Sequence, residues 1–183
     1  MDDERVQGIA NYRWVSEGIG SSGQPSEAEL EAVARSGYQV VINLGLVGED
    51  YSLPDERGAV TALGLEYVHI PVLWEQPTQG ELERFFAAMD ARKNEKVFVH
   101  CAANMRVSAF LALYRVARLG WPVEQAFREV RQMQFPEVWR QFMDAMVVRY
   151  AKSGVTQEAT SGRRCSARRG ARLPSGCRAH DRA

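Results

Sequence analysis

The residues most suited to chemistry lie between 97 and 111, where the sequence reads VFVHCAANMRVSAFL. An apolar, β-branched run ends at His100 and Cys101, and a helical pattern begins about five residues later. A strand that leads into the first turn of a helix leaves several backbone N–H groups unpaired, and together with the helix dipole they favour an anion. A cysteine thiolate is stabilised in such a place, so Cys101 is the predicted nucleophile.

The other side chains of this segment suit a site for a tetrahedral anion. The planar guanidinium of Arg106 can clamp such an anion through two N–H groups. Ser108 is expected to hydrogen-bond the sulfur of Cys101, and His100 is expected to orient the loop by bonding to its backbone. The residues predicted to bind the anion, together with His100, are those of the loop itself: Ala102, Ala103, Asn104, Met105 and Arg106.

His100 and Cys101, followed by an arginine and a serine at a helix start, resemble the signature loop of the cysteine-dependent phosphatases of the tyrosine and dual-specificity kind. The pattern of that superfamily is His-Cys-x-x-Gly-x-x-Arg-Ser/Thr. Two upstream segments, SGQPS at 22–26 and YVHIPV at 67–72, resemble its compact bacterial members. The resemblance covers residues 11–148. It implies hydrolysis of a phosphate monoester through a phosphocysteine intermediate, on a phosphorylated protein or small molecule, without a metal or an organic cofactor.

The position of the arginine departs from this pattern, because Arg106 stands five residues after Cys101 and the pattern places it six residues after. A loop that is one residue shorter leaves Arg106 in its role. An alignment without a gap puts Val107 in the arginine position and Asn104 in the glycine position, where asparagine tolerates left-handed backbone. One residue turns a helical side chain by about 100°, so the direction of the Arg106 guanidinium decides between the two.

Two other functions remain open from the sequence. The shortened Cys-x4-Arg loop has the length found in many rhodanese-like sulfurtransferases, which would carry a persulfide on Cys101. The same loop also suits a pseudophosphatase that binds anions without catalysis.

A phosphatase also needs a general acid to protonate the leaving oxygen. The family places an aspartate in the loop after the strand that ends near Ile70, but this sequence reads PVLWEQP from 71 to 77. Glu75 is therefore the candidate acid, and afterwards the base for the hydrolytic water. Asp50 and Asp55 are weaker candidates in the preceding loop.

Apolar strands alternate with amphipathic helices along the chain, which predicts a single α/β domain with a central, mostly parallel sheet flanked by helices. The predicted strands cover 11–16, 38–44, 65–70 and 96–99. The predicted helices follow Ser26 and Thr78 and cover 55–63, 106–119, 122–133 and 136–150. The glycine-rich stretch 18–23 matches G-x-G-x-x-G, but no buried strand precedes it, so a flexible loop is predicted and dinucleotide binding is rejected.

The charge distribution divides the 183 residues into a body and a tail. Residues 152–183 hold eight basic and two acidic residues, whereas residues 1–151 hold 15 basic and 21 acidic ones. We expect a lead-in over 1–10, the catalytic domain over 11–151 and a disordered basic tail over 152–183. The zero net charge argues against a nucleic-acid binder, apart from nonspecific contact by this tail.

Cysteine usage and hydropathy indicate the compartment. Only Cys101 lies in the body, the N-terminus does not resemble a secretory signal, and no apolar run is long enough for a membrane helix. A cytoplasmic protein with no membrane and no metal partner is the expectation.

Overall fold

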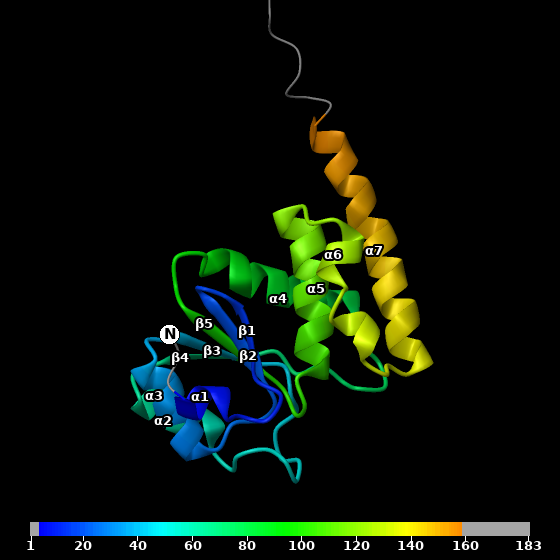
Figure 1. The fold of residues 1–183 in the computed structure, drawn as a ribbon. Coiled ribbons are helices and arrows are strands. Elements are labelled where there is room, and N and C mark those ends of the chain that lie inside the picture. The colour runs from blue at the N-terminus through cyan, green and yellow to red at the C-terminus, as the bar shows by residue number, and fades with distance from the viewer. Residues whose placement is uncertain (1–3, 159–183) are drawn as a thin grey trace, which may run out of the picture.

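The computed structural model describes residues 4–158 and shows an α/β fold built on one five-stranded sheet (Figure 1). The strands are β1 (Arg13–Ser16), β2 (Ile19–Ser22), β3 (Val40–Asn43), β4 (Glu66–His69) and β5 (Val97–His100). The helices are α1 (Glu4–Gln7), α2 (Glu27–Arg35), α3 (Glu56–Ala62), α4 (Gln79–Ala91), α5 (Met105–Leu119), α6 (Val123–Ala126), the 3₁₀ helix η1 (Val130–Gln132) and α7 (Glu137–Glu158).

The sheet has the order β1-β2-β5-β3-β4, so the strand that leads to Cys101 lies at its centre. Only β1 runs antiparallel to its neighbour, while β2, β5, β3 and β4 are parallel to one another. All four residues of β3 and of β5 are buried, as expected for strands that are covered on both faces. The mostly parallel sheet predicted from the sequence is confirmed.

Helices cover both faces of the sheet (Figure 1). On one face, α1, α2 and α3 pack over a core that includes Val33, Val41 and Phe98. On the other face, α4, α5 and α7 enclose a larger core around Phe85, Phe110 and other apolar side chains. The central helix α5 is buried over most of its length, which holds its first turn rigidly against the end of β5.

The helix ends follow the local signals in the sequence. Ser26 and Thr78 each form a capping box, with Glu29 and Glu81 respectively, at the first turns of α2 and α4. Asp55 caps α3 by accepting a hydrogen bond from the Gly58 N–H. The helix that precedes Gly120 ends there as predicted, with a left-handed φ of 67° at that glycine.

The prediction that residues 18–23 form a flexible loop is wrong, because Ile19–Ser22 forms the buried strand β2. Glycine and serine have low strand propensity, so the pattern gave no strand signal. Gly20 is needed because a Cβ there would lie 2.2 Å from the hydroxyl oxygen of Tyr38. The strand is therefore fixed by its neighbours in the fold rather than by its own composition.

Two helix predictions also differ from the structure. The helix predicted over 122–133 is divided into the single turn of α6 and the 3₁₀ turn of η1. Ala126, Phe127 and Val130 from these two turns all pack in the core beside α5. The last helix begins as predicted but continues to Glu158 rather than ending near 150.

The ends of the domain differ from the expected boundaries. Within the expected lead-in, α1 forms one helical turn, and Val6 is buried because it packs on the core beside α2. At the other end, α7 extends into the stretch expected to be tail. The rest of that expected tail, 159–183, lies outside the described residues. Across residues 4–158, no helix has the length and apolar character that crossing a membrane requires.

Candidate active site

Cys101 lies at the edge of the sheet where the parallel strands end. The strand register aligns four polar residues along this edge, namely Ser22, His100, Asn43 and His69. The carboxyl ends of parallel strands are the usual place for a binding site in α/β folds. Cys101 directly follows the central strand of this row and is separated from α5 by only three residues.

A cavity of about 320 Å³ opens over Cys101. It brings together five residues of the predicted loop with two aromatic residues from other loops: Tyr51, Trp74, Cys101, Ala102, Ala103, Met105 and Arg106. The thiol residue itself is 1% exposed. The cavity is thus a narrow access route to a single buried sulfur.

The Arg106 side chain lines this cavity and does not extend into solvent. It is 7% exposed, and its guanidinium carbon lies 5.5 Å from the centre of the Trp74 ring, a cation–π contact. Its Nε is buried without a hydrogen-bond partner, and Arg106 forms no ion pair with any residue in 4–158. A buried cation without a counter-ion is costly, so this side chain is arranged to receive an anion.

The loop over the guanidinium is held in place by α7. The indole Nε1 of the fully buried Trp139 donates a 2.7 Å hydrogen bond to the Trp74 carbonyl oxygen. The two indole rings lie 5.1 Å apart, and the Phe135 ring lies 6.1 Å from that of Trp74. These contacts fix Trp74 above Arg106.

Asn104 forms the turn between β5 and α5. Its φ of 64° is left-handed, as expected for the residue in the glycine position of the loop. The Asn104 side-chain amide donates to the Asn11 carbonyl oxygen at 2.7 Å and to the Ser21 hydroxyl at 3.2 Å. The turn is therefore anchored to β2 and to the residues before β1.

The first turn of α5 leaves amide hydrogens available for an anion. Within residues 4–158, the backbone N–H groups of Ala102, Ala103, Met105 and Arg106 form no hydrogen bond. The Ser108 hydroxyl, which was expected at the sulfur, donates to the Asn104 carbonyl oxygen at 2.7 Å. In this structure Ser108 thus stabilises the turn on which those amides stand.

His100 is tied to a buried carboxylate. Its Nε2 lies 2.6 Å from the Glu56 Oε1, and both side chains are almost completely buried. The other Glu56 oxygen accepts hydrogen bonds from the Asn43 amide at 2.7 Å and the Tyr67 hydroxyl at 3.2 Å. His100 was expected to bond to the backbone of the loop, and the structure pairs it instead with this carboxylate.

The cluster around Glu56 keeps the carboxylate ionised. Burial by itself would raise the pKa of Glu56, but the hydrogen bond and charge of His100, with the hydrogen bonds from Gln24 and Tyr67, bring it below its ordinary value. Burial, with the negative charge of Glu56 adding to it, raises the pKa of Tyr67 to about 12. The Tyr67 hydroxyl therefore remains protonated and continues to donate to Glu56.

The sequence between residues 16 and 143 matches the profile of the family PTP-NADK, described as a DSP-PTPase phosphatase fused to NAD+ kinase. This stretch includes the whole cavity and most of the sheet. The chain belongs to this family.

Two further comparisons identify proteins similar to this chain. A DUF442 protein from Shewanella putrefaciens CN-32 has a structure with a TM-score of 0.74 and 35% sequence identity, covering 80% of this chain and 97% of that one. A "Beta-lactamase hydrolase-like protein" from Xylella fastidiosa (strain Temecula1 / ATCC 700964) is 33% identical over 105 residues. That match covers 56% of this chain and 24% of the relative, so this chain spans about a quarter of the length of that curated protein.

A more distant structure shows the same fold. Pseudomonas aeruginosa TpbA in complex with pTyr is 20% identical with a TM-score of 0.59, and the match covers 83% of this chain and 91% of that one. The phosphatase-like α/β fold predicted from the sequence is thus shown by both comparisons of structure.

The structure places the acid candidates of this PTP-NADK domain away from the cavity lining. Glu75 is exposed, although its neighbour Trp74 lines the cavity. Asp50 is exposed as well, and the Asp55 carboxylate is engaged in capping α3. Tyr51, which lies in the same loop as Asp50, lines the cavity. Its hydroxyl accepts a 3.0 Å hydrogen bond from the Leu46 N–H.

Sequence reasoning missed Glu56 and its partners, although a signal was present. Gln24 lies in the SGQPS segment, which carried the resemblance, and Asn43 lies near the end of the predicted strand 38–44. Polar residues at the ends of apolar strands converge on one edge of a parallel sheet. Following that rule would have placed Asn43 near His100, but not Gln24, which follows a stretch without a strand signal, nor Glu56, which comes from a helix.

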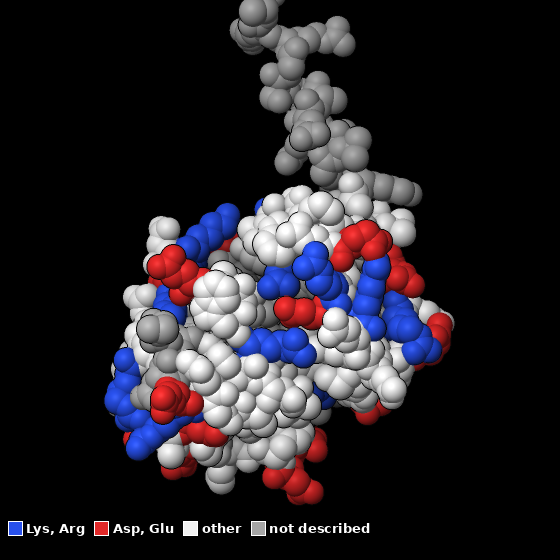
Figure 2. Space-filling view, in the orientation of Figure 1, with Lys and Arg blue, Asp and Glu red and all other residues white. Residues whose placement is uncertain are grey.

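Charged side chains on the surface of the PTP-NADK domain are interspersed in sign. Figure 2 shows basic and acidic side chains next to one another, with wide uncharged areas between them. Surface pairs such as Arg13–Glu129 and Arg118–Asp90 are part of this arrangement. Arg106 differs from these surface cations in being both buried and unpaired.

Proposed function

We propose that this chain hydrolyses phosphate monoesters through a phosphocysteine intermediate on Cys101. The observation that carries the proposal is the buried Arg106 guanidinium, without an ion-pair partner in residues 4–158, in the same cavity as the only free thiol of the described chain. Free amide hydrogens at the start of α5 supply the further donors that a bound phosphate needs.

The reaction follows from this arrangement in two steps. The Cys101 thiolate attacks the phosphorus, a P–S bond forms, and the P–O bond to the alcohol breaks. The leaving alkoxide takes a proton that we assign to Glu75, on the loop that follows β4; because the Glu75 side chain is exposed and outside the cavity lining, it must turn toward the bound substrate to give that proton. A water molecule then loses a proton to Glu75 and attacks the phosphorus, which breaks the P–S bond and restores the thiolate.

The remaining loop residues position the phosphate during these steps. The Arg106 guanidinium and the free backbone amides of Ala102, Ala103, Met105 and Arg106 bind the nonbridging oxygens. His100, held by Glu56, fixes the end of β5. Ser108 acts through the turn, because its hydroxyl donates to the Asn104 carbonyl oxygen and so holds the neighbouring amides in place.

Structural relatives support this class of substrate. The TpbA structure contains pTyr, and a structure of PTPMT1, which is 15% identical with a TM-score of 0.66, contains PI(5)P. Both ligands carry a phosphate monoester. The class of chemistry, rather than either substrate, is what we transfer to this chain.

Hydrolysis of phenyl phosphate by the full chain, in the presence of a metal chelator, tests the proposal. We expect turnover without metal, and Cys101→Ser should abolish it while inorganic phosphate still binds. Cys165→Ser and Cys177→Ser are matched controls that remove the other two thiols and should retain full activity.

The two other functions predict different results in the same preparation. Turnover that survives Cys101→Ser would refute the phosphocysteine mechanism. A persulfide formed on Cys101 from thiosulfate, in the absence of ester hydrolysis, would support a sulfurtransferase with the Cys-x4-Arg loop. Phosphate binding with neither reaction would indicate a pseudophosphatase.

A further inference from the structure

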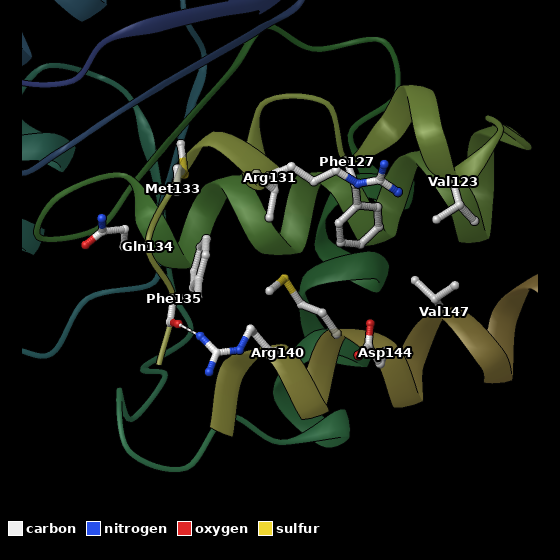
Figure 3. A pocket seen from close by; sticks show the side chains of 11 residues that line it. Val123, Phe127, Arg131, Met133, Gln134, Phe135, Arg140, Asp144 and Val147 are labelled. Atoms are coloured by element: carbon white, nitrogen blue, oxygen red, sulfur yellow. Dashed lines mark hydrogen bonds between the residues drawn. The ribbon is translucent and has the colours of Figure 1, made fainter. Parts of the chain in front are cut away.

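Three neighbouring cavities extend from Cys101 across the surface. The cavity over the thiol shares Ala103 and Met105 with a second cavity of about 330 Å³. The second cavity shares Met133 and Gln134 with a third of about 660 Å³, which lies between the α6–η1 segment and α7 (Figure 3). A volume of this size is typical of sites for small organic molecules.

Aromatic residues also connect the third cavity with the reacting groups. Phe135 lines it, and the Phe135 ring is 6.1 Å from the ring of Trp74. Trp74 in turn lies 5.5 Å from the guanidinium carbon of Arg106. Two aromatic contacts therefore connect the predicted phosphate position with the third cavity.

The third cavity has an apolar floor and a polar rim. Its buried lining residues are Phe127, Val130, Phe135 and Met143, whereas its four polar residues, Arg131, Gln134, Arg140 and Asp144, are exposed. Figure 3 shows side chains from α6 and its following turn on one side and from α7 on the other. The apolar residues are Val123, Phe127, Val130, Met133, Phe135, Met143 and Val147. The buried apolar floor favours a hydrocarbon over a strongly hydrated group.

The two arginines at this cavity are already neutralised by neighbours. Arg131 donates to both carboxylate oxygens of Glu124. Arg140 donates to Glu137 at 3.0 Å and to the Phe135 carbonyl oxygen, the bond drawn in Figure 3. The cavity thus offers no uncompensated arginine for a second phosphate, in contrast to Arg106.

We propose that the third cavity binds an alkyl chain of the substrate, whose phosphate lies against Cys101 and Arg106. This proposal rests on the proposed phosphatase function and adds the substrate class: phosphate monoesters of a small alcohol that carries an uncharged hydrocarbon chain. An alkyl chain needs no hydrogen-bond partners at the buried floor of the cavity, whereas the backbone N–H and C=O groups of a peptide would need them there.

A series of 4-alkylphenyl phosphates tests the chain-length dependence, because the alkyl group extends the substrate while the acidity of the leaving phenol hardly changes. We expect kcat/KM of the full chain to rise up to about fourfold for each methylene that becomes buried, which corresponds to about 0.8 kcal/mol. If kcat/KM did not change with alkyl chain length, at substrate concentrations below the critical micelle concentration, the proposal would be overturned. So would a preference confined to phosphopeptides with apolar neighbours.

A pair of adjacent substitutions on α7 provides the control. Val147→Trp fills part of the cavity and should reduce the gain from chain length, whereas Val148→Trp places the same side chain on a residue that is 55% exposed and does not line the cavity. Only Val147→Trp should change the ratio of kcat/KM between octylphenyl and phenyl phosphate. Val123→Trp, which fills the cavity from α6, repeats the test if the first variant does not fold.

Binding separates a failure of this proposal from a failure of the proposed function. Octylphosphonate should bind the Cys101→Ser chain more tightly than methylphosphonate, and Val147→Trp should reduce that difference. If phenyl phosphate is not hydrolysed but octylphosphonate shows this preference, the hydrolytic function is wrong and the alkyl site stands. If both phosphonates bind equally, the alkyl site is wrong whether or not the chain is a phosphatase.

Discussion

Arg106 and Glu56 are both buried charged residues near Cys101, but they differ in their partners. The Glu56 carboxylate is surrounded by donors from His100, Asn43, Tyr67 and Gln24. The Arg106 guanidinium contacts the Trp74 ring and leaves its Nε unpaired. A fully paired buried charge stabilises the fold around it, whereas an unpaired one is suited to bind a ligand of opposite charge.

Arg106→Lys tests the ligand role at the residue scale. Lysine keeps the charge but loses the planar fork that binds two phosphate oxygens, so kcat/KM for phenyl phosphate should fall by about 10²–10³-fold. Arg118→Lys, on the same helix and paired with Asp90, is the matched control and should keep full activity. Equal activity of the two variants would show that Arg106 does not hold the phosphate.

Glu56→Gln tests the paired charge through the pH dependence of stability. The pKa of Glu56 is lowered in the folded state, so the ionised carboxylate stabilises the fold fully above its ordinary pKa. That contribution disappears as the pH falls through the lower folded value. The variant should lose about 3 kcal/mol of unfolding free energy at pH 7, and its deficit should shrink in acid.

Urea unfolding of both chains between neutral and acidic pH measures this difference. Glu66→Gln is the control, since Glu66 also has a lowered pKa, caused by its hydrogen bond to Arg92, but is half exposed. The Glu66→Gln chain should lose less than about 1 kcal/mol of unfolding free energy. A constant deficit for Glu56→Gln at every pH would contradict the assignment of an ionised, paired carboxylate.

At the scale of elements, the junction between β5 and α5 depends on one left-handed residue. Asn104 combines a φ of 64° with two side-chain hydrogen bonds to the neighbouring segments. Glycine adopts this backbone conformation without steric cost, and alanine pays about 1 kcal/mol for it. The family pattern has glycine at this point of the loop.

Asn104→Gly and Asn104→Ala therefore distinguish the contribution of the left-handed backbone from that of the side-chain hydrogen bonds. Both variants lose the two side-chain hydrogen bonds, but Asn104→Ala should be less stable than Asn104→Gly by about 1 kcal/mol in urea unfolding. Because the turn also carries the amides that we propose bind the phosphate, Asn104→Ala should lose more activity than Asn104→Gly. Equal stability of the two variants would indicate that the left-handed turn does not limit the loop.

Elements with strong local signals could be predicted from the sequence, and those fixed by packing could not. The capping boxes of α2 and α4 and the glycine that ends α5 are short-range features, visible in a few adjacent residues. The strand β2 has no such signal in its own residues. Gly20 is required there because of Tyr38, which lies far away in the sequence and close to it in the fold. The division of α6 from η1 likewise depends on contacts with α5.

At the scale of the whole molecule, the site is assembled from segments far apart in the chain. The sequence was sufficient to place Cys101 and its loop between a buried strand and the start of a helix, because Cys101 through Ser108 are contiguous. The position of Arg106 inside the cavity depends on Trp74, which is held by Trp139 from α7. Contacts over such separations leave no pattern in a single sequence, and neither does the pairing of His100 with Glu56.

The most direct measurement of the central claim is the mass of the covalent enzyme intermediate. The full chain is mixed with phenyl phosphate, quenched in acid within one turnover and digested. We expect a phosphoryl group on the peptide that contains Cys101, and none in the Cys101→Ser chain. Two results would contradict the proposed mechanism. One is hydrolysis with the phosphoryl group on a residue other than Cys101, and the other is a hydrolysis rate that is the same in the Cys101→Ser chain.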